Sequence, residues 1–373
     1  VFATGAAAAD FGTPGGPQPP NLDAIAAVLR QDPYDLELLI SYGTSKGGSA
    51  GHLALAIRDQ VPGDDLVYSA NFYADRKAEH DEHFYTDELM VRIPKKEYLY
   101  GASSSLGGKA SFGLDFGEIY KRSVIGVRVY GVSPAEKVAL TDYFKRINDD
   151  YRARARNTEY HDGEVKYDYL RLNCAKTIGS GFRYGAGYRD LDVASATMLR
   201  GRRLVAAANA NVPTEMAMKL LEQWHARGFR MDVVLYRKYS GSAYVDPHED
   251  EKLAFKDLPN RFPSVLSRDF RREQGEYKDY DNLFAMHVLY NLSKYSVRVN
   301  GETKLLEIDV TRSPMPYEQA AELAEPVRRH HVGLAVVEVD LGDSLVLRVR
   351  ERHALLPRAR AARRSTSRRR RSG

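Results

Sequence analysis

The sequence predicts an α+β protein with a mostly antiparallel sheet, and three features of the chain support this class. Short segments rich in Val, Ile, Leu and Tyr recur between polar turns, which is typical of strands. Several of these segments follow one another without an intervening helix, as antiparallel hairpins do. The helical segments are grouped between runs of strands, which favours an α+β class.

The first element is expected after a linker. Residues 11–20 (FGTPGGPQPP) disfavour helix and strand, because Pro fixes φ and removes a donor while Gly raises the entropy cost of ordering. Residues 22–31 have apolar side chains at helical spacing and predict a short helix. The segments 36–43 and 51–59 predict a hairpin with a long polar loop. Further strands are predicted in residues 64–74, 87–101 and 123–132, of which the second has room for two strands.

Residues 133–153 carry the strongest helix signal. Ser133 is expected as the N-cap, Pro134 as the first helical residue and Glu136 as the acidic member of a capping box. The apolar stripe predicted to face the core comprises Val138, Leu140, Tyr143, Phe144 and Ile147.

Two further helices follow in the same part of the chain. One should begin at Cys174, directly after the good N-cap residue Asn173. The other is predicted over residues 214–228, with Thr214 as the N-cap and Gly228 at the C-terminal stop.

A second α+β unit is expected from about residue 229. It begins with a strand at 229–239 and continues with a hairpin whose Asn300-Gly301 pair predicts a type I′ turn. A helix at 316–331 and a hairpin at 332–351 complete it. The predicted division of the chain is a linker or signal remnant (1–22), a main unit (23–228), an accessory unit (229–352) and an Arg-rich disordered tail (353–373).

The basic charge of the chain is concentrated in the tail. Residues 358–373 contain eight Arg and no acidic residue, so the rest of the chain has 47 basic and 50 acidic residues. This distribution argues against a specific nucleic-acid partner. A block of like charges is typically solvated, and a tether to nucleic acid or to an anionic membrane is the alternative for this tail.

The start of the chain indicates export. Residues 1–12 (VFATGAAAADFG) resemble the end of a signal peptide with an Ala-x-Ala cleavage site, so we expect a periplasmic or secreted protein. The sequence contains no run of 18 or more apolar residues, so it predicts no membrane span. The single cysteine, Cys174, excludes an intramolecular disulfide bond.

Cys174 is the leading candidate for a nucleophile. At the start of a helix, the backbone N–H groups and the helix dipole favour an anion, here a thiolate. The same N–H groups can hold the oxyanion that forms when an acyl carbonyl is attacked. The alternative is that Cys174 is a packed small hydrophobic residue, the commoner role of a lone cysteine.

His52 is the best candidate for the base. It begins a strand directly after the glycine-rich loop SKGGSAG and lies 122 residues before Cys174. A histidine at a strand end facing a cysteine at a helix start is the papain-like arrangement, in either chain order. A third group on the next strand would orient the imidazole, and Asn71 or Ser69 could serve, although each could equally be a solvent-facing strand residue.

These motifs resemble a known family. The segments SAGHLALAI, KVALTDYFKRINDDYR and YDYLRLNCAKTI are similar to the N-terminal periplasmic domain of Lnb-type lipoprotein N-acylation transferases, over residues 34–190. The resemblance implies a circularly permuted papain-like (NlpC-type) fold for the main unit, with Cys174 as nucleophile and His52 as base. Tyr167, Tyr169 and Asn173 then lie in the approach to the cysteine.

The resulting hypothesis is a cysteine-dependent acyl-transfer enzyme that works through a thioester, without a cofactor or a metal. The substrate would be a lipid, a lipoprotein or a peptide, and Tyr169, Asn173 and Ser49 are the residues expected to contact it. A cell-wall or peptide amidase of NlpC type keeps the same chemistry. A non-catalytic envelope or secreted binding protein, with tyrosines on its recognition surface, is the competing class.

Other motifs predict no site. The segments AEHDEHFYTDE (78–88) and DPHEDE (246–251) contain His and acidic residues but lack the HExxH spacing, so solvated loops are favoured. SYGTSKGGSAG (41–51) does not match the spacing of a phosphate-binding P-loop.

Overall fold

The structure is a computed structural model of the chain. It describes residues 18–19, 22–41, 52–58, 65–70, 88–100, 124–157, 159, 163–168, 172–193, 213–236, 285, 288–299, 306–311, 314–331, 335–340 and 346–351.

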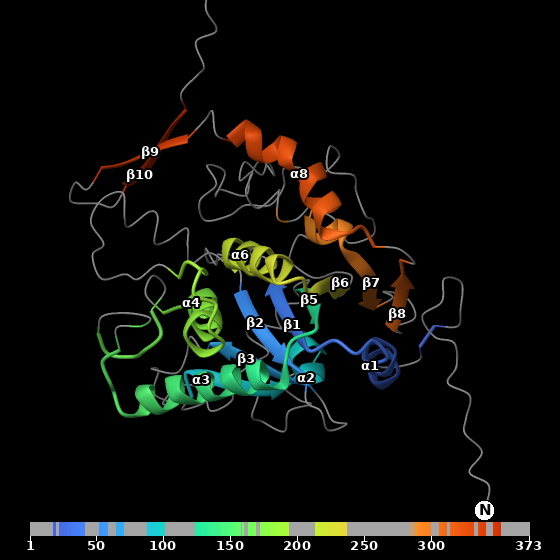
Figure 1. The fold of residues 1–373 in the computed structure, drawn as a ribbon, viewed down its shortest axis with the longest axis horizontal. Helices are drawn as coiled ribbons and strands as arrows, with labels where there is room; N and C mark the ends of the chain where they lie inside the picture. Colours follow the sequence, from blue (N-terminus) through green and yellow to red (C-terminus); the bar gives the residue numbers. More distant parts are fainter. Residues whose placement is uncertain are drawn as a thin grey trace, which may run out of the picture.

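An eight-stranded sheet forms the centre of the described part of the molecule, with the strand order β4-β3-β2-β1-β5-β6-β7-β8 (Figure 1). All neighbouring strands are antiparallel except β6 and β7, which are parallel. The predicted α+β class with a mostly antiparallel sheet is therefore confirmed. The strands are β1 (Leu36–Ser41), β2 (His52–Ile57), β3 (Leu66–Ala70), β4 (Met90–Pro94), β5 (Val124–Tyr130), β6 (Arg230–Tyr236), β7 (Ser293–Val299) and β8 (Leu306–Val310).

The sheet continues across the predicted boundary at residues 228 and 229. Strand β6 pairs with β5 along its whole length, from Val124 opposite Tyr236 to Tyr130 opposite Arg230. Strands β7 and β8 then extend the same sheet. A separate antiparallel hairpin is formed by β9 (Ala335–Asp340) and β10 (Val346–Glu351), as the sequence predicts.

The helices follow most of the sequence-based expectations. They are α1 (Leu22–Arg30), α2 (Lys95–Tyr100), α3 (Pro134–Arg152), α4 (Cys174–Ser180), the π-helical turn η3 (Gly181–Gly185), α6 (Pro213–Ala226) and α8 (Tyr317–His331). At the start of α3, the Ser133 side chain accepts a hydrogen bond from the Glu136 N–H, so the predicted cap is confirmed.

Three details differ from the prediction. Residues 95–100 form a helix and not a second strand, because the chain turns after Pro94 and buries Tyr98 and Leu99 against the sheet. Val138 is 56% exposed, since it lies about 200° around α3 from the buried Leu140. Helix α6 begins at Pro213, whose fixed φ suits a first helical position, so Thr214 lies inside the helix.

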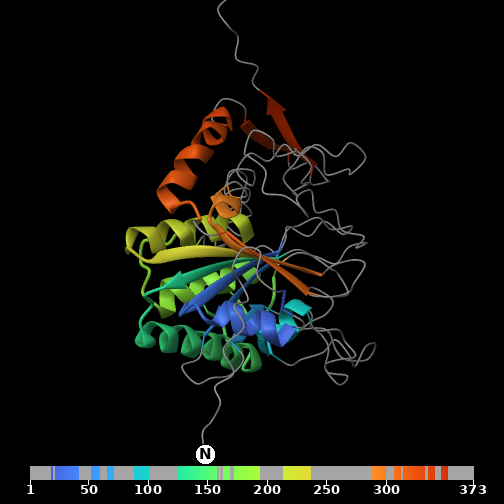
Figure 2. The same ribbon diagram turned by 90° about the vertical axis from the view of Figure 1, so that its right-hand side faces the viewer.

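The sheet has a core on each face. Because strand side chains alternate, Leu53 and Leu55 of β2 contribute to one core and Ala54 and Ala56 to the other. Helices α3, α4 and α6 cover the first face, which we call the α4 face (Figure 2). Helices α1 and α2 cover the second, which we call the α1 face. This layered arrangement packs α4 against β2 and β3.

Helix α4 lies between α3 and α6 (Figure 1). Two glycines allow this close approach. A Cβ on Gly179 would lie 2.7 Å from the Met216 sulfur of α6, and one on Gly181 would lie 2.7 Å from the Phe144 ring of α3. Every residue of α4 is buried. The helix that carries Cys174 is therefore a fixed internal element of the fold.

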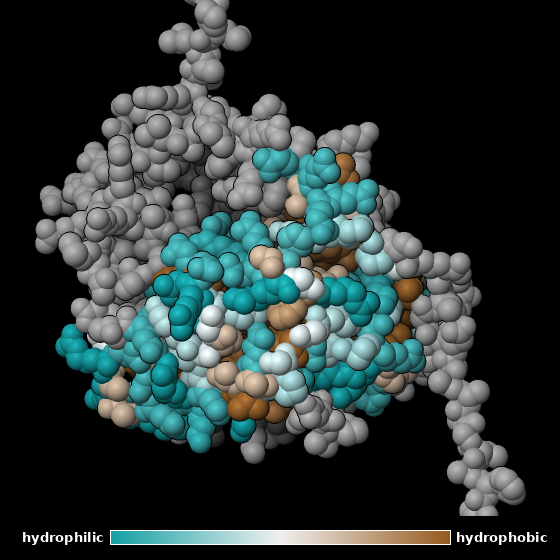
Figure 3. All heavy atoms as spheres, viewed as in Figure 1, coloured by the Kyte–Doolittle hydropathy of each residue, from teal (hydrophilic) through white to brown (hydrophobic). Residues whose placement is uncertain are grey.

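The described surface in the view of Figure 3 is mostly hydrophilic, with smaller hydrophobic areas between polar residues. In the described part of the chain, every helix is too short or too polar to cross a membrane.

Candidate functional site

Cys174 occupies the first position of α4, as the sequence predicts. The Asn173 side chain accepts a 2.9 Å hydrogen bond from the Lys176 N–H, and its extended backbone (φ −94°, ψ −175°) is typical of an N-cap. The Thr177 hydroxyl donates a 2.9 Å bond to the Cys174 carbonyl. Only 4% of Cys174 is exposed. The backbone thus provides the helix start that would stabilise a thiolate, in a buried position.

His52 is the first residue of β2 and is also buried, with 6% exposed. Its Nε2 atom lies 2.8 Å from the Ser69 hydroxyl on β3, which makes Ser69 a hydrogen-bond partner of the imidazole. Ser69 is one of the two residues that the sequence offered for the third group. The other, Asn71, lies outside the described residues, as do Ser49 and Tyr169.

The strand register decides which face His52 occupies. His52 is opposite Ser41 on β1, and Ser69 is opposite Ala54 on β2. Directly opposed residues share a face, and so do residues two apart along a strand. His52, Ser41 and Ser69 therefore lie on the α1 face, whereas Cys174 packs in the core of the α4 face. The two predicted catalytic residues come from elements in contact, α4 and β2, but from opposite sides of the sheet.

Lys176 adds a buried amine to the first turn of α4. It is fully buried, and desolvation lowers its pKa to about 8, although the charge of Asp192 acts in the opposite direction. The sequence does not single out Lys176, because a lysine in a helix normally lies on the solvent face.

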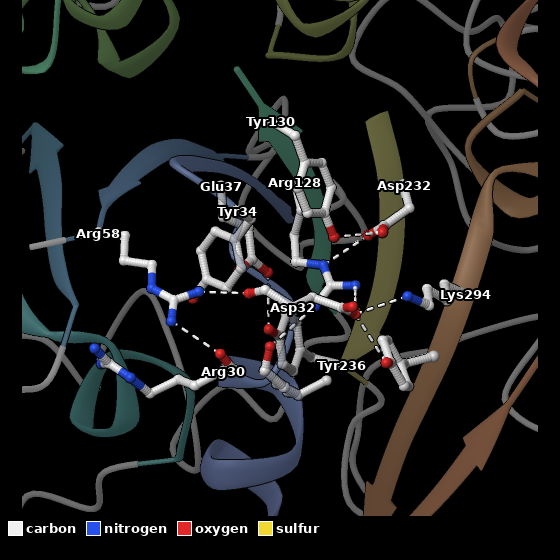
Figure 4. Close-up of polar contacts among 12 residues, drawn as sticks. Arg30, Asp32, Tyr34, Glu37, Arg58, Arg128, Tyr130, Asp232, Tyr236 and Lys294 are labelled. Carbon is white, nitrogen blue, oxygen red and sulfur yellow. Dashed lines mark hydrogen bonds and ion pairs between the residues drawn. The ribbon is translucent and has the colours of Figure 1, made fainter. Parts of the chain in front are cut away.

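A network of buried charges on the α1 face was also missed by the sequence-based reasoning (Figure 4). At its centre, the fully buried Arg128 of β5 donates to Asp232 of β6 at 2.6 Å, to Asp32 at 3.0 Å and to the Leu29 carbonyl at 3.1 Å. The Tyr130 hydroxyl donates to the second oxygen of Asp232 at 2.6 Å. Charged residues inside strand segments such as VIGVRVY and RMDVVLY are the signal that could have found it.

The network extends to β7 and favours the charged forms of Asp32 and Arg128. Asp32 accepts from Lys294 at 2.7 Å and from the Tyr295 hydroxyl at 2.9 Å. Burial by itself would raise the pKa of Asp32, but these two bonds and the charge of Arg128 outweigh it and lower the pKa. Burial likewise opposes the charge of Arg128, yet Asp232 holds its pKa above the ordinary value.

A second group of buried charges adjoins this network. Glu37 of β1 is fully buried and pairs with Lys95 of α2, and it also accepts a 2.8 Å bond from the Tyr236 hydroxyl. Gly126 of β5 makes room for this carboxylate, because a Cβ there would lie 1.9 Å from a Glu37 oxygen. Both groups of charges are paired throughout, which is how a stable fold buries charge.

The described residues hold no cluster of His, Cys, Asp and Glu that could bind a metal ion. The two His-rich acidic segments, 78–88 and 246–251, lie outside the described residues except for residue 88.

Compared with protein-family models, with curated proteins and with solved structures, the chain has no match. The resemblance to the Lnb-type family, and the permuted papain-like fold that it implies, stay predictions.

Proposed function

We propose that the protein is a cysteine-dependent acyl-transfer enzyme with Cys174 as its nucleophile and His52 as its base. The observation that carries this proposal is the start of α4. Cys174 follows the Asn173 cap and sits on a helix packed against β2, whose first residue is a histidine fixed by Ser69. An anion is favoured at such a helix start.

The proposed reaction proceeds through a thioester. His52 accepts the thiol proton, and the Cys174 sulfur adds to the carbonyl carbon of an ester or amide. Backbone N–H groups at the start of α4 donate to the oxyanion. The leaving alcohol or amine departs with the proton from the imidazolium, and water or an amine then cleaves the thioester and restores the thiol.

This mechanism has to bring together two residues on opposite faces of the sheet, because His52 lies on the α1 face and Cys174 on the α4 face. His52 is the first residue of β2, so its ring would have to reach the sulfur around the end of the strand. The same assignment favours a second candidate, a non-catalytic binding protein in which Cys174 is a packed side chain.

The pH dependence of Cys174 alkylation by iodoacetamide separates the two candidates. For the enzyme, we expect alkylation of the folded protein to titrate well below the ordinary thiol pKa of about 8.5. In His52→Ala the titration should return toward that value, because the imidazolium no longer stabilises the thiolate. The extent of alkylation is read at each pH by intact mass.

A control variant keeps the comparison specific. Ser180→Ala removes a buried hydroxyl from the other end of α4 and should leave the titration unchanged. Alkylation that occurs only after unfolding, or that is identical in the wild type and His52→Ala, would exclude the cysteine mechanism and support the binding protein.

A further inference from the structure

Two arginines lie at the turn between α6 and β6. Arg227 directly follows the last residue of α6, and Arg230 is the first residue of β6. Gly228 between them has a φ of 74°, and the N–H groups of Gly228 and Phe229 donate to carbonyls in the last turn of α6, each at 2.9 Å. These are the bonds of a Schellman motif, which fixes the course of the backbone between the two arginines.

Each of these guanidiniums lies over the ring of a buried tyrosine. The Arg227 Cζ atom is 3.8 Å from the centroid of the Tyr188 ring, and the Arg230 Cζ atom is 3.8 Å from the centroid of the Tyr130 ring. Both tyrosines are buried. A cation is attracted to the face of an aromatic ring. Stacking therefore orients each guanidinium and leaves the N–H groups along its edge for other partners.

The two tyrosine rings are held by hydrogen bonds of their own. The Tyr188 hydroxyl donates to Glu136 in the first turn of α3, and the Tyr130 hydroxyl donates to Asp232 of β6 at 2.6 Å. Asp232 also accepts from Arg128. Because the rings are fixed, the arginines stacked on them should lose less side-chain entropy on binding a ligand than mobile surface arginines would.

Both arginines are exposed, and neither has a carboxylate partner in the part of the chain that the structure describes. Arg146 of α3 is a contrasting case. Its Cζ atom is 4.7 Å from the centroid of the Tyr143 ring, but its guanidinium also pairs with Glu159. The guanidiniums of the α6–β6 turn thus differ from a stacked arginine that has its counter-charge within the chain.

We propose that Arg227 and Arg230 bind the phosphate group of a phosphate monoester. A guanidinium can donate two parallel N–H bonds to a phosphate, and such charge-assisted bonds are about twice as strong as neutral ones. A phosphate monoester carries a charge of about −1.5 to −2 at pH 7, so it balances both arginines, whereas a carboxylate balances one. This site uses neither Cys174 nor His52 and does not depend on the proposed acyl transfer.

The test follows the modification of single arginines in the full-length protein by phenylglyoxal, which reacts with guanidinium groups. Peptide mass spectrometry gives the rate at each arginine, with inorganic phosphate or with sodium chloride at the same ionic strength. At saturating phosphate, modification of Arg227 and Arg230 should slow at least about tenfold, because a guanidinium bonded to phosphate does not present its nitrogens to the reagent. Arg146 is the control and should react at the same rate in both solutions.

Variants test whether the two arginines act together. Arg227→Gln should abolish the protection of Arg230, and Arg230→Gln should abolish that of Arg227. Arg146→Gln is the matched control and should leave both protected. A lysine variant, which keeps the charge but not the planar fork, replaces any glutamine variant that fails to fold by circular dichroism, and it should reduce the protection.

Vesicles distinguish a soluble phosphate compound from a lipid headgroup. The same rates are measured with vesicles of phosphatidylcholine alone and of phosphatidylcholine with phosphatidic acid, whose headgroup is a phosphate monoester. Protection by inorganic phosphate supports a soluble ligand, and protection only by the vesicles with phosphatidic acid supports a lipid. The proposal is overturned if neither probe slows the modification of Arg227 and Arg230, or if Arg230 stays protected in the folded Arg227→Gln variant.

Discussion

At the scale of single residues, Lys176 shows how burial opposes a charge. Its side chain is fully buried in the first turn of α4, and desolvation lowers its pKa from 10.5 to about 8. The unfolded chain therefore binds more protons than the folded chain between pH 8 and 10.5. Burial of the charged amine therefore lowers the free energy of unfolding by its full amount below pH 8. This loss of stability disappears as the pH rises from 8 to 10.5.

We expect Lys176→Met to raise the free energy of unfolding at pH 7 by up to about 3 kcal/mol, because Met keeps the apolar stem and removes the buried charge. The free energy of unfolding of the wild type should rise from pH 7 to 9.5. That of the variant should not show this rise. Urea denaturation at several pH values measures both effects. Lys145→Met, at an exposed site on α3, is the control and should change neither the stability at pH 7 nor its pH dependence. An equal pH dependence of stability in Lys176→Met and in the wild type would contradict the expectation.

At the scale of elements, Asn148 joins helix α3 to the edge of the sheet. Its side-chain oxygen accepts from the Met90 N–H at 2.7 Å, and its amide donates to the Met90 carbonyl at 2.8 Å. Met90 begins β4, the strand at one end of the sheet. The Asn148 amide therefore completes the backbone bonding of an edge strand, a place where unpaired groups favour aggregation.

Replacing Asn148 by Leu should destabilise the fold by about 2 to 4 kcal/mol, since it leaves a buried N–H and a carbonyl unpaired. Amide hydrogen exchange should show the loss of protection centred on Met90, and thermal unfolding gives the total effect. Lys145→Ala on an exposed turn of the same helix should have little effect. If the Met90 amide is as well protected from hydrogen exchange in Asn148→Leu as in the wild type, the Asn148 side chain does not stabilise the edge strand β4.

At the scale of the whole molecule, the Arg128 network connects regions distant in sequence. Asp32 follows α1, Arg128 lies on β5, Asp232 on β6 and Lys294 on β7. Removing one partner of a buried pair leaves an uncompensated charge, which is strongly destabilising. The network thus links β7 to the N-terminal part of the chain.

We expect Asp32→Asn to cost about 2 to 4 kcal/mol at pH 7, toward the low end because the Asp32 side chain is partly exposed. The pKa of Asp32 is lowered in the folded state, so its contribution is present above the ordinary value of 3.8 and is lost as the pH falls below it. The variant should therefore lose less stability than the wild type between pH 5 and 3.

Urea denaturation across this pH range measures the difference. Asp149→Asn serves as the control, because Asp149 pairs with Arg152 at an exposed site where an ion pair contributes little. The expectation fails if the two variants are equally stable at pH 7.

The elements governed by local rules could be predicted from the sequence. Helix α3 follows from Ser133, Pro134 and Glu136, and the start of α4 from Asn173, because a cap needs only neighbouring residues. The hairpins of β1 with β2 and of β7 with β8 follow from apolar segments close together in the chain. The helix at 95–100 was missed, because the burial of Tyr98 in the core of the α1 face outweighed a strand-like composition.

Two properties were decided only by the tertiary structure. The pairing of β5 with β6, whose paired residues lie 100 or more positions apart in the chain, joins the two predicted units into one sheet. The register of β2 against β1 and β3 sets the face of His52 and gives it Ser69 as its partner. By itself, the sequence determined the strands, the capped helices and the identity of Cys174 and His52 as candidates. Which side chains meet was left to the fold, because a one-residue change of register turns every side chain of a strand to the other face.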